Sequence, residues 1–465
     1  MGFFKAYDMR GTFGKDFDLD MVYKVGLALP KVVTPGIASP RWLIAHDCRT
    51  TGAEVSAALE RGLRDAGAQV SDLGLASTPM VYFFTAEDGY DGSVMVTASH
   101  NPPTDNGLKV SKATALPVGY ADGLNEVERL VNNASCEKAP SDVSVADAQP
   151  PADALSRYLV WQREHGGTPP QMLRYAVDCS NGMASLFVRD LFPGAVVIND
   201  AMDGRFPAHS PNPLKDEARA QIAALVRERG LDCGVIFDGD ADRAMFVDER
   251  GEFVQPDYLV PVVARATRRF LADADSGVDE SVGVKVIHDV RTSRGAIEAL
   301  REDGFEPVMV PVGHAFAKPA LRRIGAVCGG ELAGHYYFAE FAGCDSGALA
   351  ALRVLGEVAA AKERGLSFSA MMAPISGRYA NSGELNFTVQ DKDAAIRSVM
   401  DCIAAEFPKE LSRSEMDGVR VEFADGWVNV RKSNTEPLLR LIAEFDARGK
   451  LEERVARLVR AIENA

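Results

Sequence analysis

A β-α-β pattern occurs three times along the chain and restricts its fold more than any other feature. Each copy has an apolar strand, an aspartate in a short polar turn, an amphipathic helix, and a glycine before a second apolar strand. The copies begin at Trp42, Leu173 and Val282, and they place Asp47, Asp178 and Asp289 at equivalent positions. Because domain-sized intervals separate these positions, we predict three related α/β domains with mixed sheets.

The region after the third copy has a different pattern. Short strands such as ELNFTV and WVNVRKS are combined with helices expected at residues 394–405 and 451–463, which indicates an α+β domain. A chain of 465 residues is also too long for a single hydrophobic core. We therefore expect four domains around a central cleft, at residues 1–150, 151–254, 255–370 and 371–465, with a hinge near residue 370.

Charge and cysteine content restrict the class of protein. The formal net charge is −15, which argues against non-specific binding to nucleic acid or an anionic membrane, because both require a basic surface. The seven cysteines form no C-x-x-C pair, and their odd number is typical of reduced thiols in the cytoplasm. The N-terminal residues lack the apolar segment of a signal peptide, and no apolar stretch reaches the roughly 18 residues of a membrane span. We expect a cytoplasmic protein, and the sequence does not distinguish a monomer from a dimer.

Three aspartates follow the apolar strand GVIF. The carboxylates of Asp238, Asp240 and Asp242 repel one another unless a cation lies among them, and oxygen ligands with room for a substrate oxygen suit Mg²⁺. An EF-hand is excluded because Arg243 occupies the position that requires glycine and because the flanking segments are strands. A solvated acidic turn is the other alternative, although so apolar a strand seldom ends in three unpaired acids.

A second polar loop, TASHNPPTDNGLK, follows another apolar strand. A serine after a strand commonly does no more than cap or turn the chain. Here His100 and Lys109 are close to Ser99 in the sequence, and we expect Asn106 and Gly107 to form a turn that returns Lys109 toward the serine. A phosphoryl group on Ser99 would supply the oxygen ligand that the aspartate cluster lacks, so that one cation would bridge two domains.

The segment RKSNTEP in the last domain is a compact set of hydrogen-bond donors. Arg431, Ser433, Asn434 and Thr435 suit a single anion, and Arg440 lies nearby. A polar turn between strands is the alternative interpretation.

Two loops of the third domain carry groups that suit a sugar. Glu331 and His335 in GELAGH can accept from and donate to vicinal hydroxyl groups, although such glycine-rich loops are common. His314 in PVGHAF is by itself more typical of a structural loop histidine than of a catalyst.

Together these motifs resemble those of the α-D-phosphohexomutase family, and within it the bacterial phosphomannomutase/phosphoglucomutase group. AYDMRG, TASHNP, DGDADR, GELAGH and RKSNTEP occur in the family's order over essentially the whole chain. The start FKAYDMRG is similar to the phosphomannomutase group rather than to phosphoglucosamine mutases. The resemblance implies an intramolecular phosphotransferase, an isomerase of carbohydrate metabolism that uses Mg²⁺ and a hexose 1,6-bisphosphate.

The resemblance also assigns roles to individual residues. It implies that Ser99 is the catalytic phosphoserine and a metal ligand, together with Asp238, Asp240 and Asp242. It assigns Lys109, Arg10 and Arg243 to the transfer site and His314 to proton transfer, and we include the neighbouring His100. Substrate contacts are expected from Tyr7, Arg291, Gly313, His314, Glu331, His335, Arg431, Ser433, Asn434, Thr435 and Arg440.

Three alanines depart from the family pattern. Ala241 replaces the usual glycine of the metal loop, and we expect it to be tolerated only with a negative φ. Ala315 stands where serine is frequent. Ala333 stands where the sugar-recognition loop usually has serine; the loss of one neutral hydrogen bond is worth about 0.5 to 1.5 kcal/mol. That loss could change sugar preference without abolishing turnover.

The implied reaction is reversible phosphoryl transfer between the 6- and 1-positions of mannose or glucose phosphate, through phospho-Ser99 and a bound hexose 1,6-bisphosphate. A phosphoglucosamine mutase is the nearest alternative. A Mg²⁺-dependent sugar phosphatase with Asp238 as nucleophile is an alternative of another class, because D-x-D after a strand also serves that chemistry. The alanines at 315 and 333 raise a third alternative, a non-catalytic sugar-phosphate sensor.

Overall fold

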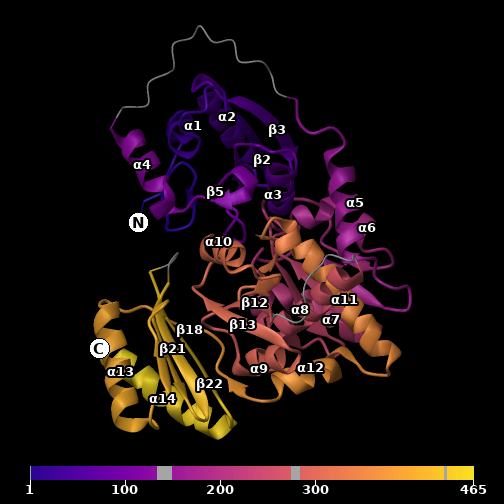
Figure 1. Ribbon diagram of the computed structural model, residues 1–465, viewed down its shortest axis with the longest axis vertical. Coiled ribbons are helices and arrows are strands. Elements are labelled where there is room, and N and C mark those ends of the chain that lie inside the picture. The colour runs from indigo at the N-terminus through magenta and orange to yellow at the C-terminus, as the bar shows by residue number, and fades with distance from the viewer. Residues whose placement is uncertain (1, 134–148, 274–282, 434–436) are drawn as a thin grey trace.

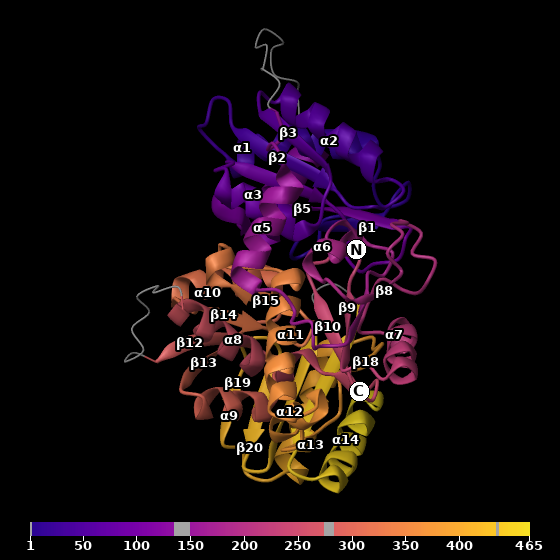
Figure 2. The same cartoon turned by 90° about the vertical axis from the view of Figure 1, so that its right-hand side faces the viewer.

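The computed structural model describes residues 2–133, 149–273, 283–433 and 437–465, which form four sheets with their helices. The first domain lies at one end of the molecule, and the other three lie together below it (Figure 1, Figure 2). This arrangement confirms the prediction of three α/β domains followed by an α+β domain. Among the described residues, no helix combines the length and apolar character needed to cross a membrane.

The first domain is a sheet with helices on both sides. Its strands are β1 (Met9–Thr12), β2 (Arg41–His46), β3 (Gln69–Leu75), β4 (Gly92–Val96), β5 (Asp105–Lys112) and β6 (Leu116–Pro117). Its helices are α1 (Leu19–Val33), α2 (Gly52–Asp65), α3 (Thr78–Glu87) and α4 (Leu124–Asn132). The strand order is β1-β5-β4-β2-β3, with β6 paired to β5.

The second and third domains repeat this plan. The second has α5 (Ala154–Gly166), β7 (Tyr175–Asp178), α6 (Val188–Leu191), β8 (Val196–Ile198), α7 (Asp216–Arg229), β9 (Cys233–Phe237), β10 (Ala244–Asp248) and β11 (Phe253–Val254). The third has α8 (Val260–Asp273), β12 (Val284–Asp289), α9 (Arg294–Glu302), β13 (Phe305–Val310), α10 (His314–Ile324), β14 (Cys328–Gly330), β15 (Tyr336–Phe338), β16 (Cys344–Asp345), α11 (Gly347–Glu363) and α12 (Phe368–Ser376).

The three sheets share one strand order, β3-β2-β4-β5, β8-β7-β9-β10 and β13-β12-β14-β15. The first three strands of each set are parallel and the fourth is antiparallel. The equivalent aspartates also act alike, because each accepts a hydrogen bond from the backbone N–H two residues later. These distances are 3.0 Å for Asp47, 2.8 Å for Asp178 and 2.6 Å for Asp289. The repeat is therefore present in topology and in loop chemistry.

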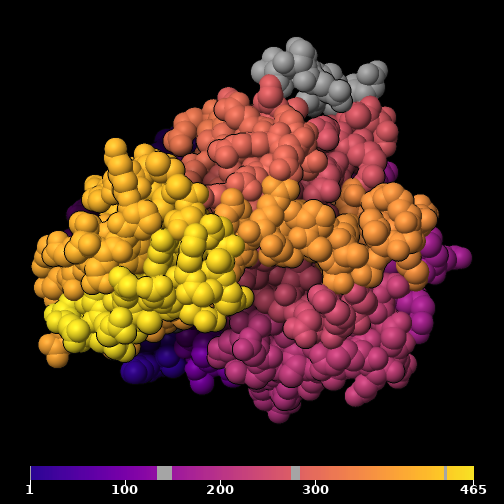
Figure 3. Space-filling model, turned by 90° about the horizontal axis from the view of Figure 1, so that it is seen from below, coloured from indigo at the N-terminus to yellow at the C-terminus, as the bar shows by residue number. Residues whose placement is uncertain are grey.

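The last domain is an antiparallel sheet with two long helices, in the order β17-β22-β21-β20-β19, with β18 paired to β22. It contains β17 (Ala380–Asn381), β18 (Leu385–Phe387), α13 (Lys392–Glu406), β19 (Ser412–Ser414), β20 (Val419–Phe423), β21 (Gly426–Lys432), β22 (Leu439–Phe445) and α14 (Arg448–Glu463). Figure 3 shows this domain packed beside the third domain. The helices expected at residues 394–405 and 451–463 are thus present.

Among the described residues, the most extensive apolar cluster extends through three domains, and smaller clusters lie within single domains. One continuous cluster includes Leu43, Tyr158, Phe237 and Leu349, and so joins the first three domains. The last domain has its own cluster, formed between its sheet and its helices. The boundary expected at residue 370 falls inside α12, which packs on α9 and α11 of the third domain. The connection to the last domain therefore follows this helix, at residues 377–379.

Candidate active site

The loop between β4 and β5 presents Ser99 at the junction of the first two domains. Ser99 is fully buried with a φ of 51°, and its backbone N–H donates to Thr97 Oγ1 at 2.8 Å. Thr97 in turn donates to Asp47 Oδ2 at 2.6 Å. The serine is therefore held in a left-handed conformation, rare for its type, by the aspartate of the first repeat.

Arg49 holds the same loop through hydrogen bonds to its backbone carbonyls. One of its Nη atoms donates to the carbonyls of Pro102 and Asp105, both at 2.7 Å, and the other to those of Ser99 and Asn101, both at 2.8 Å. Its Nε lies 3.2 Å from Asp47 Oδ2. The buried guanidinium thus holds four loop carbonyls, which a flexible ammonium could not do in one geometry.

The expected turn at Asn106 and Gly107 is not present. Both residues belong to β5, which pairs with β1 and β4, and the chain reverses before residue 105. Pairing on both edges of the strand outweighed the local preference of Asn-Gly for a turn. Lys109 nevertheless lies on the strand that returns from the serine loop.

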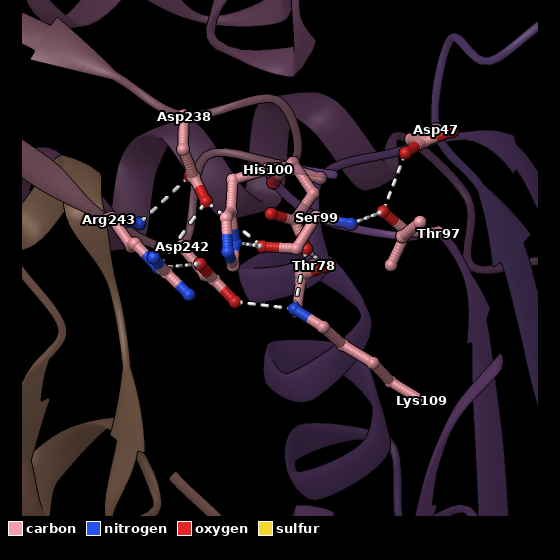
Figure 4. A network of polar contacts seen from close by, with 12 residues as sticks. Asp47, Thr78, Thr97, Ser99, His100, Lys109, Asp238, Asp242 and Arg243 are labelled. Carbon is pink, nitrogen blue, oxygen red and sulfur yellow. Dashed lines mark hydrogen bonds and ion pairs between the residues drawn. The ribbon is translucent and has the colours of Figure 1, made fainter. Parts of the chain in front are cut away.

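The serine loop of the first domain meets the acidic loop of the second. Ser99 Oγ donates to Asp238 Oδ2 at 3.1 Å, and His100 Nδ1 lies 3.2 Å from the same hydroxyl (Figure 4). The loops approach closely because Gly239 has no side chain; a Cβ there would lie 2.7 Å from the Ser99 carbonyl oxygen. The proximity expected between the two loops is therefore present.

Lys109 connects the two domains by charge. Its ammonium lies 2.6 Å from Asp240 Oδ2 and also 2.6 Å from Asp242 Oδ2. Figure 4 shows the contact with Asp242. Burial lowers the pKa of Lys109, but the two carboxylates outweigh burial and raise it. Burial raises the pKa of Asp240, but the positive charge of Lys109 outweighs burial and brings that pKa below its usual value. For Asp238, burial and repulsion from the other two aspartates raise the pKa well above its usual value.

The acidic loop has the properties of a cation site. One oxygen from each of Asp238, Asp240 and Asp242 lies within 4.8 Å of the others, and all three side chains are buried. Among the described residues, Oδ1 of Asp240 and Oδ1 of Asp242 accept no hydrogen bond. Buried carboxylate oxygens without donors are costly, and a hard divalent cation would satisfy them. This acidic cluster can therefore bind a metal ion.

Ala241, inside this loop, corrects one expectation. Its φ is +61°, not negative. The loop turns sharply here because Gly239 approaches the serine loop on one side and the N-terminal residue of α11, Gly347, contacts the Ala241 carbonyl on the other. The backbone path therefore overrides the preference of alanine, and Ala241 occupies a conformation that normally favours glycine.

Arg10 and Arg243, from the first and second domains, lie beside the serine loop and the acidic loop. Arg10 Nε donates to Asp8 Oδ2 at 2.7 Å, and Arg10 Nη1 donates to the Ala98 carbonyl at 3.3 Å, beside the serine. Arg243 Nε donates to His335 Nε2 at 2.9 Å and lies 3.6 Å from Asp238 Oδ2. Burial, followed by the positive charges of Arg243 and Arg10, lowers the pKa of His100 well below its usual value. His100 is therefore neutral at pH 7.

The loop of residues 331–335 contacts the acidic loop through His335. Its Nε2 accepts from Arg243, and its Nδ1 donates to Asp345 Oδ2 at 2.6 Å, so both ring nitrogens are engaged. Lys318 Nζ lies 2.7 Å from the other oxygen of Asp345. Burial raises the pKa of Asp345, but the positive charge of Lys318 outweighs burial and holds that pKa well below its usual value. Asp345 thus orients His335 through the Nδ1 atom, and Lys318 holds Asp345 in place.

Glu331 lies at the start of the same loop and is buried. It accepts a hydrogen bond from the hydroxyl of Tyr337, and its Oε2 lies 3.6 Å from Arg291 Nη2. Burial raises its pKa.

His314 lies at the first residue of α10, opposite a tyrosine from the first domain. Tyr7 donates to the Val312 carbonyl at 3.0 Å, and the rings of Tyr7 and His314 are 6.0 Å apart. Gly313 adopts a φ of +118°, and a Cβ there would lie 3.0 Å from the Tyr7 ring, so both the turn and the contact require glycine. Burial, then Lys318 and Lys109, lowers the pKa of His314 well below its usual value.

The expected phosphate loop lies at the end of β21. Arg431 and Arg440 are direct cross-strand partners on β21 and β22. Both donate to Glu384, Arg431 at 3.2 Å and Arg440 at 2.9 Å, and Arg291 of the third domain donates to the same carboxylate at 3.2 Å. Ser433 N–H donates to the Leu438 carbonyl at 2.9 Å, whereas Asn434 and Thr435 lie outside the described residues.

Sequence reasoning missed several residues of this site, namely Arg49, Thr78, Lys318, Asp345 and Glu384. Thr78 donates to Asp240 Oδ2 at 2.5 Å from the N-terminus of α3. Only Arg49 left a signal, because D-x-R occurs in the first and third repeats, at Asp47 and Arg49 and again at Asp289 and Arg291. The others are brought together by contacts between domains, which sequence spacing does not report.

Four family models together cover most of the chain. They describe the α/β/α domains I, II and III and the C-terminal domain of phosphoglucomutase/phosphomannomutase, and they match residues 1–137, 164–251, 256–376 and 384–462. A phosphomannomutase of Escherichia coli is 34% identical over 457 residues, covering 96% of this chain and 95% of its own length. The chain belongs to the phosphoglucomutase/phosphomannomutase family.

Other relatives agree with this assignment. Phosphohexose mutases of Xanthomonas campestris are 36% identical over 445 residues, covering 95% of this chain and 94% of their own. The crystal structure of a phosphoglucomutase/phosphomannomutase family protein from Burkholderia thailandensis superimposes with a TM-score of 0.84 at 29% identity, covering 99% of this chain and 97% of that one. This member of the family is thus a phosphohexomutase, an isomerase of carbohydrate metabolism that acts on hexose phosphates.

Proposed function

We propose that this phosphohexomutase transfers a phosphoryl group between the 6- and 1-positions of mannose or glucose phosphate through phospho-Ser99. The observation that carries the proposal is the 3.1 Å contact between Ser99 Oγ and Asp238 Oδ2 across the domain junction. It puts the hydroxyl that would carry the phosphoryl group beside the cluster suited to a divalent cation. A hexose 1,6-bisphosphate is the intermediate that this chemistry requires.

Asp238, Asp240 and Asp242 would hold Mg²⁺, which would neutralise charge on the phosphoryl oxygens when bound. Phosphoryl transfer depends on positioning and charge stabilisation rather than on covalent assistance, and Arg243, Arg10 and Lys109 surround the serine with positive charge. His100 lies at the reacting hydroxyl. Either His314 or Lys109 transfers the proton of the substrate hydroxyl.

The bisphosphate must turn around before the second transfer. The phosphate held by Arg431, Ser433, Asn434 and Thr435 would leave that loop and face Ser99, and the newly formed end would replace it. Tyr7, Gly313, Glu331 and His335 would contact the sugar, whose hydroxyls are similar in both orientations. We propose that the last domain opens about residues 377–379, since it has a core of its own.

Three predictions from the sequence remain proposals. Glucosamine phosphate is the alternative substrate, and initial rates with mannose 1-phosphate, glucose 1-phosphate and glucosamine 1-phosphate, each with Mg²⁺ and bisphosphate, would rank the three. A dominant rate with glucosamine 1-phosphate would overturn the preference for mannose or glucose. A cytoplasmic location and a monomeric or dimeric state remain expectations.

Replacement of the serine tests the mechanism. Ser99→Ala should abolish both labelling of the protein by glucose 1,6-bisphosphate and conversion of mannose 1-phosphate, because it removes the hydroxyl proposed to carry the phosphoryl group. The exposed Ser412 lies in the last domain, and Ser412→Ala is the matched control that should retain both. A phosphatase that uses Asp238 would continue to release phosphate after Ser99→Ala, and that result would contradict the mutase mechanism.

A further inference from the structure

Glu384 accepts hydrogen bonds from three guanidinium groups, those of Arg431 and Arg440 in its own domain and that of Arg291 in the third domain. Its Oε1 accepts from Arg291 and Arg431, each at 3.2 Å, and its Oε2 accepts from Arg440 at 2.9 Å. The Glu384 side chain is only 17% exposed. Burial raises the pKa of Glu384, but Arg291, Arg431 and Arg440 outweigh burial and bring it to about 2. The carboxylate is therefore fully ionised under all ordinary conditions.

Two of these arginines require an anion between them. Arg431 and Arg440 are directly opposite on the antiparallel strands β21 and β22, and like charges at such positions destabilise a sheet. Burial, followed by the positive charge of Arg291, lowers the pKa of Arg431, whereas the negative charge of Glu384 raises it. Glu384 supplies the missing negative charge in the structure.

Arg431 retains capacity for a second anion. Its side chain is 2% exposed, yet among the described residues its Nε donates no hydrogen bond. Its Nη1 is 3.9 Å from Asp417 Oδ2, beyond hydrogen-bond distance. A guanidinium has five N–H donors in a planar fork that matches phosphate oxygens, so Arg431 has donors to spare. Arg291 differs, because its Nε and Nη2 already donate to Asp289.

We propose that Glu384 is an internal anion that competes with the phosphate of the substrate for Arg431 and Arg440, and thereby limits how tightly the last domain holds that phosphate. The inference rests on the proposed function, which places a hexose phosphate at this loop. A phosphate dianion has more charge and more acceptor oxygens than a carboxylate, so it displaces Glu384 when it binds. The displaced carboxylate remains nearby and repels the phosphate, which eases its release when the bisphosphate turns.

Equilibrium binding without turnover gives the sharpest test. In a Ser99→Ala background, calorimetry with glucose 1-phosphate should show about three- to tenfold tighter binding after Glu384→Gln, as expected for removal of one competing charge. Glu410→Gln is the matched control, because it removes one negative charge from the exposed end of the same domain near β19, at the opposite edge of the sheet. This control should bind as the parent does.

A second measurement separates competition from a structural role. With Ser99 intact, Glu384→Gln should lower both KM and kcat, because a tighter grip delays reorientation. A structural role predicts instead a raised KM and a lower melting temperature. Inorganic sulfate should also raise the melting temperature of Glu384→Gln more than that of the unchanged protein, which provides a readout even if the variant is destabilised.

Unchanged or weaker glucose 1-phosphate binding by Glu384→Gln, with no greater effect of sulfate, would overturn the competition. Loss of binding in the Ser99→Ala parent itself would overturn the proposed function and this inference with it. The two failures are thus distinguishable.

Discussion

Ala241 has a backbone conformation that the packing around its loop imposes. Its φ is +61°. The residue lies between Gly239, where the serine loop approaches closely, and the start of α11. The left-handed conformation costs an L-residue roughly 1–2 kcal/mol. The chain therefore accepts a local cost in the loop that carries the three aspartates.

Restoring glycine at this position should stabilise the protein. Ala241→Gly removes the conformational cost, and the greater freedom of glycine in the unfolded chain offsets about 0.5–1 kcal/mol of the gain. A modest rise in melting temperature is expected, corresponding to about 0.5–1 kcal/mol. Ala244→Gly is the control: Ala244 is buried in β10 without a positive φ, and its loss should lower the melting temperature. A fall for both variants would contradict the strain.

At this scale the sequence identified the residues whose chemistry is distinctive. The aspartates 238, 240 and 242 could be named because three acids after an apolar strand are unusual. Ser99 could be named only because His100 and Lys109 accompany it in the sequence. The sign of φ at Ala241 could not be predicted, since it depends on two neighbouring segments that pack against the loop from other parts of the chain.

At the scale of elements, the connection between β4 and β5 is rigid although it is a loop. Arg49, which follows β2, binds four of its carbonyls, and Asp47 orients both Arg49 and Thr97. The serine is consequently positioned by a neighbouring β-α turn of its own domain. Such support from a second element is needed wherever a reacting group must be held within a fraction of an ångström.

Arg49→Lys should therefore impair phosphoryl transfer rather than binding. Lysine cannot hold four carbonyls at once, so the loop should shift, and the rate of Ser99 phosphorylation by glucose 1,6-bisphosphate should fall by roughly 10- to 100-fold. KM for hexose phosphate should change little, because Arg431 and Arg440 lie in another domain. Rapid-quench labelling gives the rate, with the exposed Arg41→Lys as control. An unchanged rate in Arg49→Lys would refute this role.

The elements themselves were largely predictable, and their ends were not. The three repeats and the helices of the last domain follow from apolar periodicity. The expected end of the third domain, residue 370, lies inside α12, a helix that packs on α9 and α11. A turn was predicted at Asn106 and Gly107 because the neighbouring sequence does not indicate that β5 pairs with a strand on each side.

At the scale of the molecule, one apolar cluster extends through the first three domains, and the main cluster of the last domain is separate from it. The contacts between the third and last domains are mainly polar: Arg294 binds Glu422 at 2.6 Å, and Arg420 donates to the Val290 carbonyl at 2.5 Å. Polar contacts can be exchanged for water at lower cost than an apolar core can be opened. The last domain is therefore the part suited to move as a unit.

Differential scanning calorimetry should resolve this division as two transitions. Val428 is fully buried in the core of the last domain, and Val428→Ala should cost roughly 1.5–3 kcal/mol there, lowering only one transition. Val235 belongs to the shared core of the first three domains, and Val235→Ala should lower only the other. A single transition that moves with both variants would show that the four domains unfold together.

The small cluster of Leu332, Trp427 and Ile442 is the apolar exception at this junction. Leu332 directly follows Glu331, so a rotation of the last domain that displaces Trp427 also displaces the loop proposed to read the sugar hydroxyls. Opening of the last domain would then release the contacts at both ends of the hexose 1,6-bisphosphate in one step. Closing would re-form both sets of contacts only around a correctly oriented bisphosphate, before the second phosphoryl transfer.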